Sequence, residues 1–299
     1  MTAKIEASAP LRVDLAGGWT DVGPYPTDFG GEVVNFAINL RVIAKIMDGH
    51  REDGIEYEFP APRGSGLGTS SAMNVASAAL MHPEEAGKPE ALAERAFLTE
   101  SLEGNLCGRQ DQWASAFGGF NHLLFIGNSV EMMPFEPMNS AKNWLKRHLI
   151  IAFSGESRRS GEMQELVWGR YSDGDLGVIE GLNIIRGSAR EMASGLQKDR
   201  RDLVVKSLRN VCEGVDLIDK SIHEPFREAL DPLVSNGTVA AWKALGAGGG
   251  GCAAILCSQN GLGELKHAIE AFDWDIIEWD YEDQGVQIAG CTHSPNAQT

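Results

Sequence analysis

The chain has 299 residues, 43% of them hydrophobic, and its 26 basic and 42 acidic side chains give a formal net charge of -16. That length and apolar content suffice for one large domain or two medium ones. The negative charge disfavours nonspecific binding to nucleic acid or to an anionic membrane, so we expect neither as a partner.

The sequence shows little sign of export, of a membrane span or of paired cysteines. The first residues lack the apolar core of a signal peptide, and no apolar run approaches the ~20 residues of a membrane span. The five cysteines are scattered and form no CxxC pair, which disfavours both a zinc site and a disulfide framework. We therefore expect a cytoplasmic protein.

The first half of the chain alternates strand and helix patterns. Residues 48–63 carry charges, a glycine and two prolines, and are predicted to form a short connection. The apolar patterns predict strands over residues 5–15, 33–47 and 120–126, and helical segments over 72–81, 90–103 and 111–117.

A second unit is predicted to begin near Asn143, which divides the chain into domains 1–142 and 143–299. Residues 238–245 are predicted to end a helix, and 274–279 to form the last strand. Other segments of this unit are predicted as strands over 148–153 and 252–257, and as helices over 176–196, 202–213 and 265–272. This mixed order predicts an α+β protein rather than a repeated βαβ plan.

Residues 64–71 (GSGLGTSS) are the most informative stretch. Three alternating glycines and three hydroxyl residues precede a predicted helix. Glycine lets the backbone approach a ligand closely, and a helix N-terminus presents free N–H groups to an anion. The segment therefore indicates a phosphate site, although a tight turn with a serine N-cap would need no ligand. The residues assigned to nucleotide binding are Gly64, Ser65, Gly66, Leu67, Gly68, Thr69, Ser70 and Ser71.

A second glycine run, residues 246–251, matches GxGxxG. The dinucleotide-binding fingerprint needs a strand before and a helix after the glycines, whereas here we predict a helix before and a strand after. No GxxxxGK[ST] motif occurs, which excludes a P-loop. Two glycine-rich loops, one in each predicted unit, fit phosphoryl transfer, in which the protein mainly positions reactants and stabilises charge.

Three motifs in this order resemble those of the GHMP kinases: residues 10–21 (PLRVDLAGGWTD), 64–71 and 245–251 (LGAGGGG). Residues 107–112 (CGRQDQ) add to the resemblance. The first motif is most similar to L-fucokinases and D-glycero-D-manno-heptose 7-phosphate kinases, whereas galactokinases carry GEHTD where this chain has GGWTD at 17–21.

The resemblance implies an N-terminal domain like ribosomal protein S5 domain 2 and a ferredoxin-like C-terminal GHMP kinase domain. It also implies ATP and Mg²⁺ as cofactors, with the sugar bound between the domains. A homodimer is one expectation for the assembly, and the sequence leaves the oligomeric state open.

Asp111 and Arg12 are the catalytic residues that the resemblance implies. A carboxylate beside a sugar hydroxyl can orient it and accept its proton. The charge of Arg12 would favour the ionised carboxylate and stabilise negative charge that develops on oxygen. The alternatives are that Asp111 caps a helix and that Arg12 forms a surface ion pair.

The acceptor site is predicted to include Asp21, whose carboxylate can accept hydrogen bonds from two vicinal hydroxyls. A turn-forming aspartate is the alternative. Trp19 could stack on a sugar face or belong to the core. The remaining residues assigned to substrate binding are Thr20, Gly248, Gly249 and Arg158.

Ser71 and Glu100 form the magnesium pair by analogy with the family, and Glu103 competes with Glu100. Magnesium also takes phosphate oxygens and water as ligands, so few protein ligands are expected. A solvated helix face is the alternative interpretation of both glutamates.

The sequence thus predicts an ATP-dependent kinase that phosphorylates the anomeric hydroxyl of a fucose-like monosaccharide to give a sugar 1-phosphate. The first alternative is a heptose 7-phosphate kinase, in which Arg158 or Arg159 would contact the second phosphate. The other is a nucleotide- and sugar-binding regulator without turnover, which the presence of Arg12, Asp111 and Ser71 disfavours.

Overall fold

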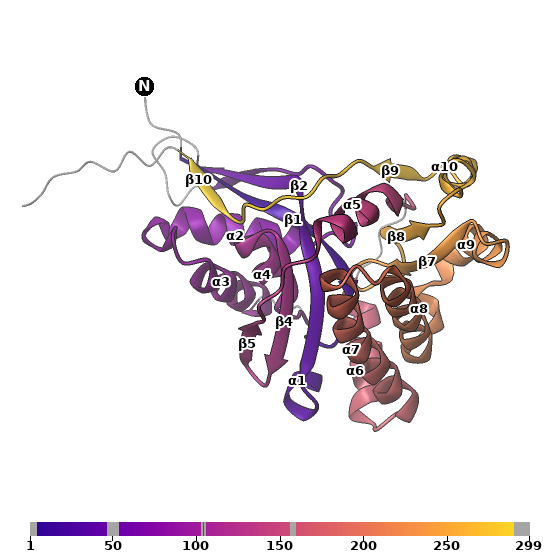
Figure 1. The fold of residues 1–299 in the computed structure, drawn as a ribbon. Coiled ribbons are helices and arrows are strands. Elements are labelled where there is room, and N and C mark those ends of the chain that lie inside the picture. Colours follow the sequence, from indigo (N-terminus) through magenta and orange to yellow (C-terminus); the bar gives the residue numbers. More distant parts are fainter. Residues whose placement is uncertain (1–4, 47–53, 103, 105, 156–159, 290–299) are drawn as a thin grey trace, which may run out of the picture.

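The computed structural model describes residues 5–46, 54–102, 104, 106–155 and 160–289. They form two antiparallel sheets with helices packed against both, which confirms the predicted α+β class (Figure 1). Buried hydrophobic side chains of the two sheets and their helices make up one contiguous core. Within the described part of the chain, no helix combines the length and the apolar character needed to cross a membrane.

The first sheet has the strand order β10-β1-β2-β4-β5, and β3 pairs with β2 outside this path. Its strands are β1 (Glu6–Ala16), β2 (Gly31–Ile46), β3 (Ile55–Glu58), β4 (Phe120–Ile126), β5 (Ser129–Met132) and β10 (Gln287–Ala289). The first eight residues of β2 are all buried, because α2 and α7 both pack against this strand. This explains why apolar residues there do not alternate with exposed polar ones, and why the two polar residues of this stretch, Glu32 and Asn35, are also buried.

Three helices, α2 (Thr69–Met81), α3 (Pro89–Leu102) and α4 (Gln110–Phe117), pack on one another beside the first sheet (Figure 1). Helix α2 is rich in alanine, and its small residues allow close packing against β1 and β2. Two short helical segments, α1 (Tyr25–Asp28) and η1 (Pro83–Glu85), lie in the connections.

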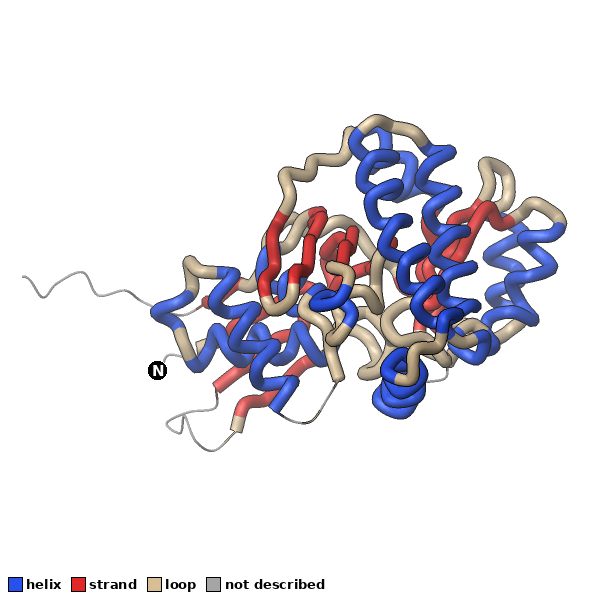
Figure 2. The backbone as a smooth tube through the Cα atoms, turned by 90° about the horizontal axis from the view of Figure 1, so that it is seen from below, coloured by secondary structure: helices blue, strands red, loops and turns tan. Residues whose placement is uncertain are grey.

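The second sheet has the strand order β7-β8-β6-β9. Its strands are β6 (Leu149–Phe153), β7 (Val239–Ala244), β8 (Cys252–Cys257) and β9 (Asp275–Ile277). Helices α7 (Leu176–Gln197) and α8 (Arg201–Ile218) pack along each other and lie between the two sheets, since α7 contacts β2 and α8 contacts β7 (Figure 2). The remaining helices of this half are α5 (Asn139–His148), α6 (Ser160–Ser172), η2 (Lys220–Ile222), α9 (Glu224–Ser235) and α10 (Leu262–Ala271).

The prediction that residues 238–245 end a helix is wrong. They include strand β7, which pairs antiparallel with β8. The segment TVAAWKAL is rich in helix-forming residues, but it is buried in the second sheet, and this tertiary context outweighs the local propensity. Residues 246–251 therefore join two strands of a hairpin, and a strand still follows them, so the dinucleotide-binding context remains absent.

Two further expectations need correction. Residues 48–63 are more than a connection, because they contain β3, which pairs with the end of β2. Strand β9 is not the last strand, since β10 follows it and pairs with the start of β1. The final described segment thus returns to the first sheet. The proposed boundary at residues 142 and 143 falls inside α5.

Candidate active site

A cavity of about 260 Å³ lies where the two glycine-rich loops meet. Helix α6 contributes Gly161 and Gln164 to its wall. The cavity gathers most of the residues that the sequence analysis singled out. Those that line it are Arg12, Trp19, Asp21, Gly64, Gly66, Gly68, Thr69, Ser70, Ser71, Glu100, Asp111 and Gly248.

The first glycine loop leads directly into α2. Gly64, Gly66 and Gly68 have φ values of 75°, 80° and 75°, which lie in the left-handed region that favours glycine. Gly68 is the N-cap of α2, and no side chain caps the helix. The alternative interpretation, a turn with a serine N-cap, is therefore wrong, and the first-turn N–H groups can bind an anion at the positive end of the helix.

The second glycine loop packs backbone to backbone against the first. A Cβ atom at Gly66 would lie 2.4 Å from the Leu245 carbonyl oxygen, and one at Gly251 would lie 2.8 Å from the Ser65 carbonyl oxygen. The Cys252 N–H donates to the same Ser65 carbonyl at 2.8 Å. Glycine is required here because any side chain would separate the two loops.

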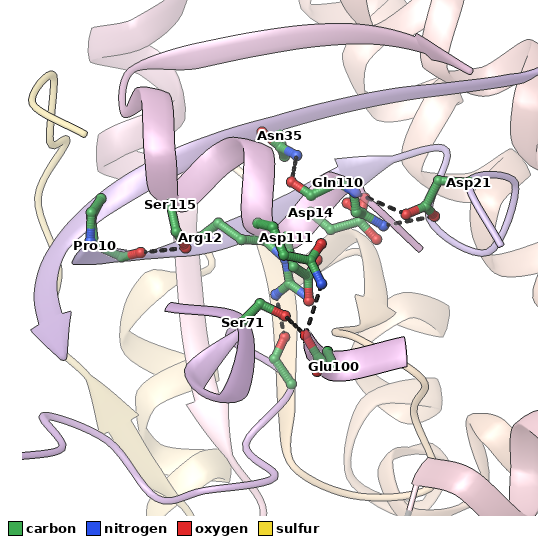
Figure 3. Close-up of polar contacts among 12 residues, drawn as sticks. Pro10, Arg12, Asp14, Asp21, Asn35, Ser71, Glu100, Gln110, Asp111 and Ser115 are labelled. Atoms are coloured by element: carbon green, nitrogen blue, oxygen red, sulfur yellow. Dashed lines mark hydrogen bonds and ion pairs between the residues drawn. The ribbon is translucent and has the colours of Figure 1, made fainter. Parts of the chain in front are cut away.

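Arg12 and Asp111 form a bidentate ion pair at the cavity wall (Figure 3). The Arg12 Nε donates to Asp111 Oδ1 at 2.7 Å and its Nη2 donates to Oδ2 at 2.6 Å, while its Nη1 donates to the Gly66 carbonyl. Burial opposes the charge of Arg12, but the Asp111 carboxylate together with the charges of Asp14 and Asp21 outweighs it, so the pKa of the guanidinium is raised. The Arg12 side chain is only 2% exposed and Asp111 is 23% exposed, so the pair presents its carboxylate to the cavity.

Both alternative interpretations of this pair are thereby excluded. Arg12 is buried rather than on the surface. Asp111 lies in the first turn of α4, whose N-cap is Arg109, so Asp111 does not cap the helix.

Asp21 lies at the cavity wall in the turn that follows β1. Its Oδ2 accepts a hydrogen bond from the Gln110 backbone N–H at 3.0 Å, and its Oδ1 accepts one from the Gln110 side chain at 3.2 Å (Figure 3). Burial raises the pKa of Asp21 to about 7, and the nearby charges of Asp111 and Asp14 add to the shift. A Cβ atom at Gly108 would lie 1.8 Å from Asp21 Oδ2, so this carboxylate explains the glycine of the CGRQDQ motif.

The other residues predicted to bind the substrate differ in whether they line the cavity. Trp19 lines the cavity, and it also packs against Trp168 with ring centroids 6.4 Å apart. Thr20 and Gly249 do not line it: the Thr20 hydroxyl donates to the Gly17 carbonyl at 2.7 Å, and the Gly249 N–H donates to the Ile222 carbonyl at 2.8 Å. Both hold loop backbone in place. Arg158, Arg159 and Glu103 lie outside the described residues.

Ser71 and Glu100 are in direct contact. The Ser71 hydroxyl donates to Glu100 Oε2 at 2.9 Å, and the Gln112 side-chain amide donates to the same oxygen at 2.8 Å. Glu100 is buried, which excludes the solvated-face interpretation, and burial raises its pKa despite these hydrogen bonds. A hydroxyl and a carboxylate side by side at the end of a phosphate-binding loop are oxygen ligands of the kind that Mg²⁺ prefers.

The sequence analysis missed four residues of this network: Asp14, Gln110, Gln112 and Lys243. Strand alternation could have found Asp14, because it lies two residues after Arg12 and so projects from the same face of β1. No local pattern indicates Lys243, which reaches this network from the other sheet.

Comparison with known proteins identifies a family model and several relatives that are similar to this chain. Residues 36–119 match the model of the GHMP kinases N terminal domain. The D-glycero-alpha-D-manno-heptose 7-phosphate kinase of Campylobacter jejuni is 25% identical over 95% of this chain and 98% of its own length. The bifunctional fucokinase/GDP-fucose pyrophosphorylase of Arabidopsis thaliana is 25% identical over 92% of this chain, which spans only 32% of that longer protein.

Solved structures share the fold. A D-glycero-D-manno-heptose 1-phosphate kinase from Bacteroides thetaiotaomicron superimposes with a TM-score of 0.74 at 22% identity, over 95% of this chain and 98% of that one. The mevalonate kinase of Methanococcus jannaschii superimposes with a TM-score of 0.68 at 16% identity, over 92% of this chain and 98% of that one. These matches support the predicted GHMP kinase superfamily: residues 36–119 carry its N-terminal domain, and the chain is similar over nearly its whole length to a sugar kinase, a phosphotransferase with an alcohol group as acceptor.

Proposed function

We propose that this GHMP-type sugar kinase transfers a phosphoryl group from ATP to the anomeric hydroxyl of a monosaccharide and so makes a sugar 1-phosphate. One observation carries the proposal: the Asp111 carboxylate faces the cavity between the α2 N-terminus and Asp21, held in place by Arg12. A carboxylate fixed between a phosphate site and a hydroxyl-binding group can orient the attacking hydroxyl and accept its proton.

The chain fits a nucleoside triphosphate at residues 64–71. The left-handed glycines and the uncapped α2 N-terminus leave backbone N–H groups for phosphate oxygens. In this proposal the same groups, together with Arg12, would stabilise negative charge that develops during transfer.

The Ser71 hydroxyl and the Glu100 carboxylate are the residues that would hold Mg²⁺. The raised pKa of Glu100 marks a buried carboxylate whose charge no cation among the described residues balances by a direct ion pair. A divalent cation would neutralise charge on the phosphates and compensate this carboxylate.

On the acceptor side, Asp21 and Trp19 fit a sugar better than a charged acceptor. The Asp21 carboxylate retains lone pairs for hydroxyl groups beyond its two bonds to Gln110, and the Trp19 indole offers an apolar face. Among the described residues that line the cavity, Arg12 is the one cation, and Asp111 already pairs with it.

The test is an ADP-release assay with Mg-ATP against L-fucose, galactose, mannose, arabinose, glucuronate and heptose 7-phosphate. We expect one strong acceptor among the free sugars, and phosphorus NMR of its product should show the new phosphate on C1. Transfer to a different hydroxyl would refute the regiochemistry. ATP binding without transfer to any acceptor would instead favour the regulator.

A heptose 7-phosphate kinase is the second candidate, because the Campylobacter jejuni relative aligns over nearly the full length of both chains. The same panel separates the two. A kcat/KM for heptose 7-phosphate that exceeds those for all the free sugars would replace the first proposal with this one.

A further inference from the structure

A buried lysine of the second sheet forms an ion pair with an aspartate of the first sheet, behind the residues that line the cavity. Lys243 in β7 donates to Asp14 Oδ2 in β1 at 2.6 Å and to the Asp14 carbonyl oxygen at 3.0 Å. The side chains are only 4% and 2% exposed. Neither residue lines the cavity, so we expect the pair to act on a substrate only through other residues.

The Asp14 end of the pair supports the acceptor-binding turn, residues 17–21. A Cβ atom at Gly18 would lie 2.1 Å from Asp14 Oδ2, so the backbone of the turn rests directly on this carboxylate. The pairing of β1 with β2 also shifts register between Asp14 and Ala16, just before the turn. The Lys243 bond to the Asp14 carbonyl therefore fixes the strand where its ladder is irregular.

The Lys243 end of the pair supports the second glycine loop. Lys243 lies two residues before Leu245, whose N–H donates to the Cys252 carbonyl at 2.8 Å and closes the hairpin. The Leu245 carbonyl in turn packs against Gly66 in the first loop. The Lys243 ammonium group thus supports three segments. It supports residues 17–21 through Asp14, the second glycine loop through β7, and the first glycine loop through the second.

Stability alone is a poor explanation for this pair. Burial lowers the pKa of Lys243 although Asp14 opposes the shift, and Asp14 Oδ1 has no hydrogen-bond partner among the described residues. Well-packed apolar residues are often as stable as a buried ion pair, whereas removing one partner leaves an unpaired buried charge. We propose that Lys243 is a positioning residue that, through Asp14, holds residues 17–21 in the geometry that places the acceptor alcohol at Asp111. The acceptor part of this statement rests on the proposed function.

The test compares Lys243→Met with the wild-type enzyme in two measurements. Hydrogen exchange of the full chain without substrate reports on residues 17–21 independently of activity. Steady-state kinetics then separate the KM for ATP from the KM for the best sugar acceptor. We expect faster exchange in the turn and an acceptor KM raised by about tenfold or more, with an ATP KM close to that of the wild type, because a small misplacement at a reacting centre has a large kinetic effect.

Two further variants separate positioning from stability. The double variant Lys243→Met with Asp14→Leu removes both charges and should recover most of the thermal stability, yet its acceptor KM should stay raised. It also carries the test if Lys243→Met alone does not fold. Asp216→Asn is the matched control, because it removes an ion pair with Arg227 at 2.5 Å in the same half of the chain, away from the cavity. It should lower stability without raising the acceptor KM.

The outcomes are distinct. A double variant with wild-type acceptor KM and wild-type exchange in residues 17–21 would overturn the positioning role and leave a structural ion pair. Faster exchange with an unchanged acceptor KM would overturn the assignment of the turn to the acceptor, which belongs to the proposed function. Faster exchange with a raised acceptor KM supports both.

Discussion

The two walls of the cavity are built on different principles. The wall from the first half of the chain carries charged and hydroxyl side chains, including Arg12, Ser71, Glu100 and Asp111. The wall from residues 245–250 offers only Leu245, Ala247 and glycines, and so presents backbone and shape. Charged and hydroxyl side chains are therefore concentrated on the first wall, whereas the second wall contributes closely packed backbone.

This difference shows that a glycine-rich loop has two separate uses. At Gly68 a Cβ atom would make ordinary contacts at 3.4 Å or more, so glycine serves there mainly for its left-handed backbone next to a helix N-terminus. At Gly251 a Cβ atom would collide with the Ser65 backbone, so glycine serves there for close approach. Substitutions on the first wall should therefore change catalysis, and substitutions on the second should change packing.

The largest expected effect is that of Asp111→Asn. The amide keeps the shape of the side chain but cannot accept the proton of the acceptor hydroxyl, so we expect kcat to fall by at least ~100-fold while ATP binding stays nearly intact. Steady-state kinetics and isothermal titration with ATP measure the two quantities. Asp175→Asn, at the N-cap of α7 away from the cavity, is the control. Full activity of Asp111→Asn would remove Asp111 from the catalytic role.

The next largest effect is expected for Gly251→Ala at the second wall, which should lower the free energy of unfolding. Gly251→Ala places a methyl group 2.8 Å from the Ser65 carbonyl oxygen at a φ of 79°. Backbone strain alone costs roughly 1–3 kcal/mol, and the collision adds to it. Gly237→Ala is the matched control, because its φ is 83° but nothing lies within 4 Å of the new methyl group. Denaturant unfolding should show a clearly larger loss for Gly251→Ala, and equal losses would mean that the loops do not need their close contact.

A smaller effect is expected for Ser71→Ala. Loss of one oxygen next to Glu100 should weaken the apparent affinity for Mg²⁺ by about tenfold, with little change in maximal rate at saturating Mg²⁺. Titrating activity with Mg²⁺ at fixed ATP measures this. Ser77→Ala on the same helix serves as the control, because the wild-type Ser77 hydroxyl donates to the Met73 carbonyl and does not contact Glu100. An unchanged Mg²⁺ requirement in Ser71→Ala would exclude this ligand.

The smallest effect, and the one that depends on pH, is that of Asp21→Asn. The pKa of Asp21 is about 7 in the folded protein against an ordinary value of 3.8, so folding takes up a proton between these pH values and stability falls as pH rises through that window. Asparagine removes this dependence. Its amide can pair with Gln110 Oε1, which has no partner among the described residues of the wild type.

Thermal unfolding from pH 4 to pH 8 tests this prediction. Asp21→Asn should gain stability over the wild type as pH rises toward 8, and its acceptor KM should be raised at pH 8. Parallel stability curves for the two proteins would show that the Asp21 carboxyl does not titrate in this window.

Much of the site follows from local sequence because its residues lie in short motifs. Gly64 to Ser71 are contiguous, and Arg12 and Asp21 flank one strand end, so their roles could be hypothesised together. The contact between Arg12 and Asp111, 99 residues apart, came only from the resemblance to a family. Thr20 shows the limit of a motif, since it shares the motif with Asp21 but turns its hydroxyl to the backbone.

What could not be predicted depends on contacts between distant segments. Lys243 sits in an alanine-rich stretch that is typical of a helix, and only pairing with β8 makes it a strand residue that reaches Asp14. Strand β10 has three residues, too few to show a period, and it forms because β1 offers it an edge.

The return of β10 to β1 has a consequence for how the protein is made. Strand β1, which carries Arg12 and Asp14, pairs with β2 on one side, while on its other side Glu6, Ala7 and Ser8 pair with the distant Ala289, Ile288 and Gln287, respectively. Until β10 has been synthesised, that side of β1 is an open strand edge, which other nascent chains could pair with. The last described segment closes this edge, so the first sheet is protected on this side only after the segments of both sheets have been synthesised.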